Sequence, residues 1–94
     1  KQVDVLLTMS KDDFRKAIIR DGYGAIVLES RASSPENTAA LAPGDYTLEV
    51  QGRFSRNKKK TELSIATPQE IHCEMREEVV GCWNQSKRNL ISLE

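Results

Sequence analysis

Alternating apolar and polar residues are the strongest pattern along this chain, and they predict strands. Val3, Val5, Leu7 and Met9 recur at every second position, which is typical of a strand with one buried face. The remaining stretches that alternate, or that carry a short apolar run between turn residues, are 25–30, 45–54, 61–66, 70–76, 79–84 and 89–93. The pattern therefore predicts a mainly β fold of six or seven short strands.

A short helix is expected at residues 10–21. Ser10 and Asp13 resemble a capping box with Asp in place of Glu, acidic residues precede basic ones, and Gly22 fits the end of a helix. Apolar residues occur at helical spacing, at Phe14, Ala17 and Ile18. The alternative is a hairpin that turns at Asp21 and Gly22, because Asp-Gly favours two-residue turns.

Residues 32–43 are expected to form the longest irregular stretch, since Pro35 and Pro43 interrupt regular structure. The strands at 45–54 and 61–66 would then form a hairpin with a polar tip, pairing Val50 with Ile65. Layered packing of these strands suggests an antiparallel β-sandwich, formed as one domain over residues 1–94. A chain of this length buries about 60–65% of the surface exposed on unfolding, so any cross-link adds appreciable stability.

The stretch LAPGDYTLEVQG at residues 41–52 resembles the Pro-Gly-x-Tyr start of a late strand in immunoglobulin-like and transthyretin-like β-sandwich domains. The resemblance implies a tyrosine corner, in which the hydroxyl group of Tyr46 bonds the backbone near Ala42. It brings no activity with it. Leu48 stands where an immunoglobulin domain carries a cysteine, so no specific family is identified.

The two cysteines, Cys73 and Cys82, lie in neighbouring predicted strands. A hairpin that turns about residues 77–78 and pairs Arg76 with Val79 places the cysteines opposite each other. Facing Cβ atoms in such a pair lie about 4.5–5.5 Å apart, which is close to disulfide range. We expect a disulfide bond that contributes about 2–3 kcal/mol of stability.

Buried free thiols are one alternative to the disulfide, and a copper(I) site formed by Cys73, Met75 and Met9 is another. A redox pair would need two intervening residues, and zinc would need four ligands. We therefore expect no metal ion and no cofactor. A disulfide favours a periplasmic or extracellular location.

The other side of the same hairpin is expected to carry a partner-binding surface. His72 and Trp83 lie opposite each other there, flanked by Glu74 and Arg76. A tryptophan beside polar groups is typical of binding sites, although a tryptophan that merely covers the sheet would give the same pattern.

Charge is balanced overall, with 14 basic and 14 acidic residues, which disfavours nucleic acid as a partner. Positive charge is concentrated in the segment 53–60, which is either a solvated hairpin tip or a binding site for nucleic acid or another polyanion. The basic residues of this segment are Arg53, Arg56, Lys58, Lys59 and Lys60.

No apolar run approaches the length of about 18 residues that a transmembrane helix needs. The chain begins with lysine and not with methionine, so we expect that something upstream was removed, either by the cell or when the sequence was cut, which is compatible with an exported protein. Asn84 begins an Asn-x-Ser glycosylation sequon.

Catalysis is not expected, because the chain has a single histidine and no Ser/His/Asp arrangement or glycine-rich phosphate loop. The sequence predicts a non-catalytic interaction or assembly module of an exported protein, such as an accessory of a bacterial surface or secretion apparatus. Its partner would be another protein, bound by the surface patch or by strand-edge pairing. A small polyanion-binding domain is the alternative function.

Overall fold

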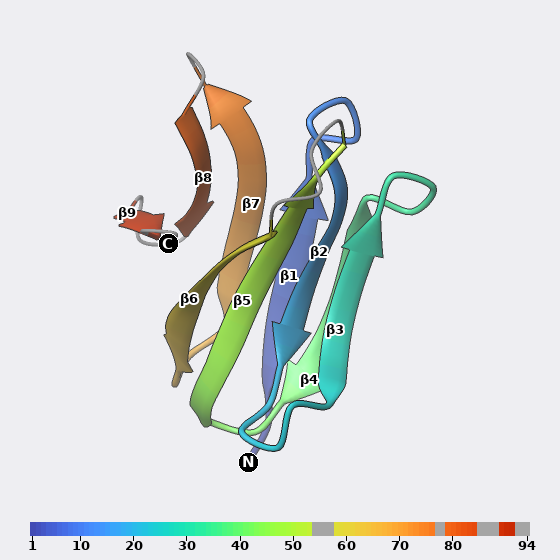
Figure 1. Ribbon diagram of the computed structural model, residues 1–94. Coiled ribbons are helices and arrows are strands. Elements are labelled where there is room, and N and C mark those ends of the chain that lie inside the picture. The colour runs from blue at the N-terminus through green and yellow to red at the C-terminus, as the bar shows by residue number, and fades with distance from the viewer. Residues whose placement is uncertain (54–57, 77–78, 85–88, 92–94) are drawn as a thin grey trace.

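The computed structural model describes residues 1–53, 58–76, 79–84 and 89–91, and within these ranges the chain forms nine strands and no helix. Figure 1 shows the strands in two layers. In chain order they are β1 (Val3–Met9), β2 (Phe14–Arg20), β3 (Ile26–Arg31), β4 (Glu36–Leu41), β5 (Gly44–Gly52), β6 (Lys58–Ile65), β7 (Gln69–Arg76), β8 (Val79–Asn84) and β9 (Asn89–Ile91). The predicted mainly β class is confirmed, with more strands than the six or seven expected.

The two layers are sheet A, with the strand order β4-β1-β7-β8-β9, and sheet B, with the order β3-β2-β5-β6. Neighbouring strands run antiparallel except for β1 and β7, which run parallel. A purely antiparallel arrangement is therefore wrong at this pair. The long crossover that a parallel pair requires is supplied by the strands that lie between them in the sequence.

The core lies between the sheets and is formed by alternate residues of the long strands. Val5 and Leu7 of β1 pack with Leu48 of β5 and Ile71 of β7, and all four side chains are almost completely buried. Their neighbours along each strand point outward, because successive side chains of a strand face opposite sides of the sheet.

The helix expected at residues 10–21 is wrong. One helical turn forms, in which the backbone N–H groups of Asp13 and Phe14 donate to the carbonyl oxygen of Ser10. The chain then extends into β2, which pairs with β3 on one side and with β5 on the other. The β-branched residues Ile18 and Ile19 favour this extended form.

A β-bulge between Phe14 and Lys16 explains why the spacing looked helical. The extra residue shifts the alternation of β2, so Phe14, Ala17 and Ile19 all face the core. Ile18 is buried as well, but it lies on the opposite side of sheet B. The buried residues on the two sides of β2, taken together, have the spacing expected for the apolar face of a helix.

The alternative hairpin interpretation of this segment is correct in outline. Residues 21–25 connect β2 to β3, so the loop is longer than the two-residue turn considered. One carboxylate oxygen of Asp21 accepts the backbone N–H groups of both Tyr23 and Ala25 at 2.9 Å. This side chain fixes the turn in the way that Asp residues commonly do.

The irregular stretch expected at residues 32–43 contains β4, so that prediction is also wrong. β4 pairs antiparallel with β1 at the edge of sheet A and places Leu41 in the core. Four of its six residues, Glu36, Asn37, Ala39 and Ala40, have weak strand propensity, and the pairing with β1 therefore accounts for the strand. Pro35 and Pro43 lie just outside it.

The predicted hairpin of β5 and β6 is present in another register. Val50 lies opposite Lys59 and not opposite Ile65. The three lysines 58–60 consequently begin β6 and do not belong to the hairpin tip. Ile65 is buried, as the alternation predicted.

Two side-chain hydroxyl groups fix the fold, one near the start of β5 and one in the interior. The Tyr46 hydroxyl group donates to the carbonyl oxygen of Ala42, which is the contact that the tyrosine-corner resemblance implied. Inside the fold, Ser30 Oγ of β3 donates to the Leu7 carbonyl oxygen of β1 at 2.7 Å. Because Ser30 is fully buried, this hydrogen bond joins the two sheets and leaves no unsatisfied hydroxyl group.

Candidate functional site

The hairpin of β7 and β8 has the register that the sequence predicted. Cys73 lies opposite Cys82, and Arg76 lies opposite Val79. The two sulfur atoms lie 2.09 Å apart, at the distance of a disulfide bond, and both cysteines are fully buried. The cysteine pair therefore holds β8 against β7 from the core side of sheet A.

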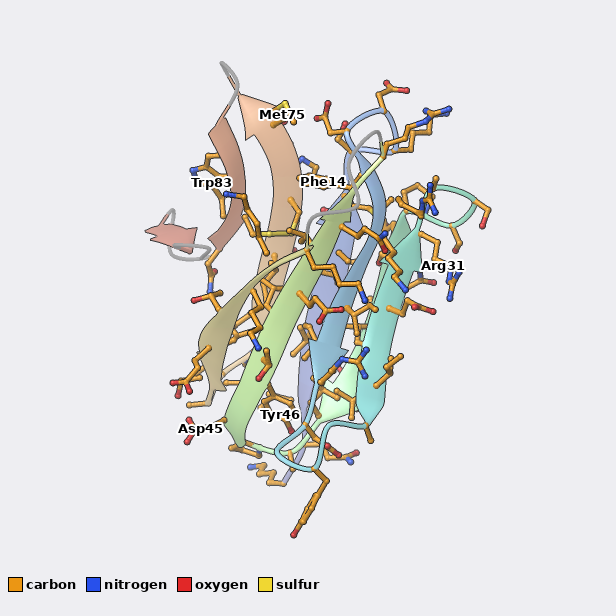
Figure 2. All side chains as sticks on the ribbon, in the orientation of Figure 1. Phe14, Arg31, Asp45, Tyr46, Met75 and Trp83 are labelled. Atoms are coloured by element: carbon orange, nitrogen blue, oxygen red, sulfur yellow. A yellow bond between two sulfur atoms is a disulfide. The ribbon has the colours of Figure 1, made fainter. Side chains whose placement is uncertain are left out.

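The outward side of this hairpin brings together three of the four predicted partner-binding side chains. His72 lies opposite Trp83, and the imidazole Nε2 of His72 lies 3.6 Å from a carboxylate oxygen of Glu74. Figure 2 shows Trp83 on β8, projecting from sheet A. For Arg76, the structure describes the backbone and leaves the side chain outside the described residues.

Thr8 belongs to the same surface, although the sequence did not reveal it. In the parallel pairing of β1 with β7 it lies beside His72, and its hydroxyl Oγ1 lies 2.7 Å from the His72 Nδ1 atom. His72 is thus held on both sides, by Thr8 and by Glu74, and about a quarter of each of the His72 and Glu74 side chains is exposed. Thr8 and His72 are 64 residues apart in the sequence, and the pairing of β1 with β7 brings them together.

We call the outward side of sheet A the outer A face. Its described side chains include Asp4, Thr8, Glu36, Glu70, His72, Glu74 and Trp83. Carboxylates thus surround the His72–Trp83 pair, and Asp4, Glu36 and Glu70 are exposed. This face suits a partner that offers positive charge around an apolar or aromatic contact.

Two further residues of the hairpin, Met75 and Asn84, lie in contrasting environments. Met75 lies on the core side but is 42% exposed, because it stands near the end of β7, beyond the packed region (Figure 2). Asn84 is buried, and its side-chain amide donates to Gln69 Oε1 at 2.8 Å. The side chain of Asn84, which begins the sequon, is therefore almost inaccessible in the folded protein.

The described residues of the predicted polyanion-binding segment do not all lie on the same side of sheet B. Arg53 follows β5, and Arg56 lies outside the described residues. Lys58 and Lys60 project from the outward side of sheet B, because they lie opposite Gln51 and Glu49. Lys59 lies opposite the core residue Val50 and projects from the other side of β6.

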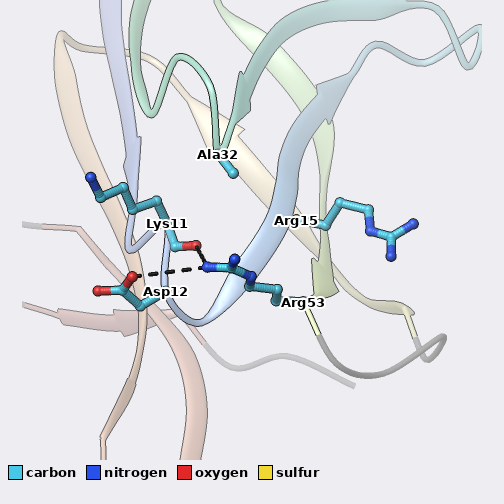
Figure 3. A pocket seen from close by; sticks show the side chains of 5 residues that line it. All are labelled: Lys11, Asp12, Arg15, Ala32 and Arg53. Carbon is cyan, nitrogen blue, oxygen red and sulfur yellow. Dashed lines mark hydrogen bonds and ion pairs between the residues drawn. The ribbon is translucent and has the colours of Figure 1, made fainter.

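Arg53 borders a hollow at the end of sheet B, together with residues of the turn between β1 and β2 (Figure 3). Its guanidinium group donates to the carbonyl oxygen of Lys11 at 3.3 Å and lies 3.9 Å from a carboxylate oxygen of Asp12. Arg15 and Ala32 complete the lining. Sequence inspection missed Lys11 and Arg15, since they are far from residues 53–60 in the chain.

Strand edges are present in both sheets. The outermost strands among the described residues are β4 and β9 in sheet A and β3 and β6 in sheet B. The first half of β6 carries the exposed residues Lys58, Lys59 and Lys60, and lysines at an edge oppose pairing with a further strand. Edge pairing is thus less favoured at this half of β6.

Within the described ranges, no three His, Cys, Asp or Glu side chains gather as a metal ion would require. No helix long and apolar enough to cross a membrane occurs in the same ranges. Comparison of the chain with protein-family models, with curated proteins and with solved structures finds no match in any of the three.

Proposed function

We propose that the protein is a non-catalytic interaction module of an exported protein, folded as a β-sandwich, and that it binds another protein through the outer A face. The observation that carries the proposal is the His72–Trp83 pair on a hairpin whose two cysteines are at disulfide distance. Aromatic side chains with a polar surround contribute much of the binding energy at protein interfaces.

The hydrogen-bond geometry supports this use of the face. Thr8 and Glu74 hold the imidazole of His72 in one position, and strand pairing with β7 places Trp83 beside it. Side chains that are already ordered lose little conformational entropy when a partner binds. The surrounding carboxylates favour a partner with a basic surface.

The cysteine pair supports the proposed location. Disulfides persist in oxidising compartments and are rare in the cytosol, so we place the protein in the periplasm or outside the cell. Non-reducing intact-mass measurement with thiol labelling tests this step. A mass two hydrogens below that of the dithiol supports it, and two labelled thiols in protein taken from its own cells would contradict it.

Site-specific photo-crosslinking tests the binding face. A photoreactive amino acid replaces Glu70 on the outer A face in one variant and Glu62 on the outward side of sheet B in the other. Both positions are exposed glutamates in strands, so they form a matched pair. We expect a protein adduct in the native cells from position 70 and none from position 62.

The captured protein is then purified and titrated with the unlabelled module. Trp83→Ala is expected to weaken binding at least tenfold, in the range of interface hot spots, and His72→Ala is expected to weaken it less. Equal crosslinking from positions 62 and 70, or unchanged affinity for a folded Trp83→Ala variant, would overturn the proposal.

A further inference from the structure

A row of polar and basic side chains crosses the whole outward side of sheet B. Strand pairing sets Arg31 of β3 beside Lys16 of β2, Lys16 beside Gln51 of β5, and Gln51 beside Lys58 of β6. We call these four residues the basic row. Adjacent strands lie about 4.8 Å apart, so the row extends over roughly 14 Å.

The basic row adjoins the hollow at the end of sheet B, because the lining residues Arg15 and Ala32 are next to members of the row in the chain. Figure 3 shows the lining of this hollow. The carbonyl oxygen of Arg15 accepts the backbone N–H group of Ala32, which keeps the start of β2 next to the end of β3. The backbone N–H group of Arg53 donates to the Asp13 carbonyl oxygen. The guanidinium group of Arg53 also donates to the carbonyl oxygen of Lys11, so Lys11, Arg15 and Arg53 add positive charge next to the row.

Two of the six cations are paired with carboxylates in the free protein, Arg31 with Glu29 and Arg53 with Asp12. Among the described residues, no acidic group lies within ion-pair distance of Lys11, Arg15, Lys16 or Lys58. Asp13 directs a carboxylate oxygen to the backbone N–H group of Met75 at 3.0 Å. Uncompensated cations on one surface create a positive potential that concentrates anionic ligands.

Arg31 is the exception within the row. Its Nε donates to one carboxylate oxygen of Glu29 at 2.9 Å, and a terminal nitrogen donates to the other at 3.2 Å. Glu29 therefore neutralises Arg31 in the free protein. An anionic ligand would have to share Arg31 with this carboxylate.

We propose that the basic row and the adjoining hollow bind a sulfated polysaccharide. A single small anion cannot engage cations spread over roughly 14 Å, whereas an extended chain with many sulfate groups can contact several at once. Guanidinium and ammonium groups form charge-assisted hydrogen bonds with such oxyanions.

Single-stranded nucleic acid fits this surface less well. Single-stranded nucleic acids stack their bases on aromatic side chains, and the described residues of the row and the hollow include none. Phe14, at the start of β2, is fully buried. The choice of a sulfated polymer also uses the exported location proposed above.

Binding to dextran sulfate, measured by isothermal titration calorimetry over a series of salt concentrations, tests the proposal. Neutral dextran and a single-stranded DNA oligonucleotide serve as comparison ligands. We expect affinity for dextran sulfate that falls steeply with salt because counterions are released, weaker binding of the oligonucleotide, and no binding of neutral dextran.

Two double variants of equal net charge locate the site. Lys16→Gln with Lys58→Gln removes two cations of the row. Lys1→Gln with Lys59→Gln removes two lysines outside it, because Lys59 projects from the other side of β6 and Lys1 lies at the opposite end of the molecule (Figure 1). We expect the first variant to lose at least tenfold in affinity and about two units of salt slope, and the second to bind as the unmodified protein does.

Glu29→Gln supplies a gain-of-binding test, since it frees Arg31 and should strengthen binding several-fold. Equal losses in the two double variants, tighter binding of the oligonucleotide than of dextran sulfate, or no binding of dextran sulfate would each overturn the proposal. These measurements do not involve Trp83 or His72. They therefore distinguish failure of this site from failure of the proposed protein-binding face.

Discussion

The outward sides of the two sheets are built in different ways. On the outer A face, the short side chain of Thr8 and the neighbouring carboxylate of Glu74 hold His72 beside Trp83. The outward side of sheet B carries long charged side chains around Ile18, which is only 1% exposed. There Ile18 lies opposite Glu29 on one side and Glu49 on the other.

This difference separates two kinds of recognition. Ordered groups such as the His72–Trp83 pair favour one partner of matching shape, because little entropy is lost on binding. Long lysine and arginine side chains adapt to many anion positions, and their attraction weakens as salt rises. The two proposals therefore assign a selective protein-binding face to sheet A and a less selective charged face to sheet B.

The largest expected effect is a loss of stability, and it tests how tightly the two sides of β2 are packed. Ile19→Ala, in the fully buried core, is expected to reduce the free energy of unfolding by about 2–5 kcal/mol. Ile18→Ala removes the same atoms from beneath flexible side chains that can close over the gap, so we expect about 1–2 kcal/mol. Urea unfolding of the two variants measures both values. Equal losses would show that the outward side of sheet B is packed as tightly as the core.

The next largest effect concerns the hairpin under the outer A face. Replacing Cys73 and Cys82 together by alanine should reduce the free energy of unfolding by about 2–3 kcal/mol, mainly because the unfolded chain gains freedom. Amide hydrogen exchange should quicken most in β7 and β8 and least in β2 and β5. An equal change in both sheets would mean that the cysteine pair supports the entire fold and not this face in particular.

The hairpin of β7 and β8 could be derived from the sequence because two constraints agreed there. Alternation indicated which side each residue faces, and a turn expected about residues 77–78 gave a register that also placed the two cysteines opposite each other. For residues 10–21 the alternation was ambiguous. The bulge at Arg15 and the burial of Ile18 on the outward side of sheet B gave the apolar residues the spacing of a helix. β4 was missed because its strand form depends on its partner β1.

In the candidate sites, too, residues paired locally could be found from the sequence, and residues brought together by distant strands could not. His72 and Trp83 could be paired from the sequence, because they lie in adjacent strands joined by a short turn. Thr8 could not be added, since a parallel pairing between distant segments leaves no local signal. Lys16 and Arg31 were likewise missing from the basic surface, because their place depends on β2 being a strand.

The smallest effect tests whether the outer A face is ordered before a partner binds. Thr8→Val preserves the shape of the side chain and removes its contact with His72 Nδ1, so we expect a loss of about 0.5–1.5 kcal/mol in the free energy of unfolding. Thr38→Val is the control, because Thr38 is an exposed threonine on the same face in the neighbouring strand β4. We also expect the ring signals of His72 to broaden or shift in nuclear magnetic resonance spectra of Thr8→Val alone. If both variants leave stability and the His72 signals unchanged, the imidazole is not held by Thr8, and the contrast between an ordered face on sheet A and an adaptable one on sheet B fails.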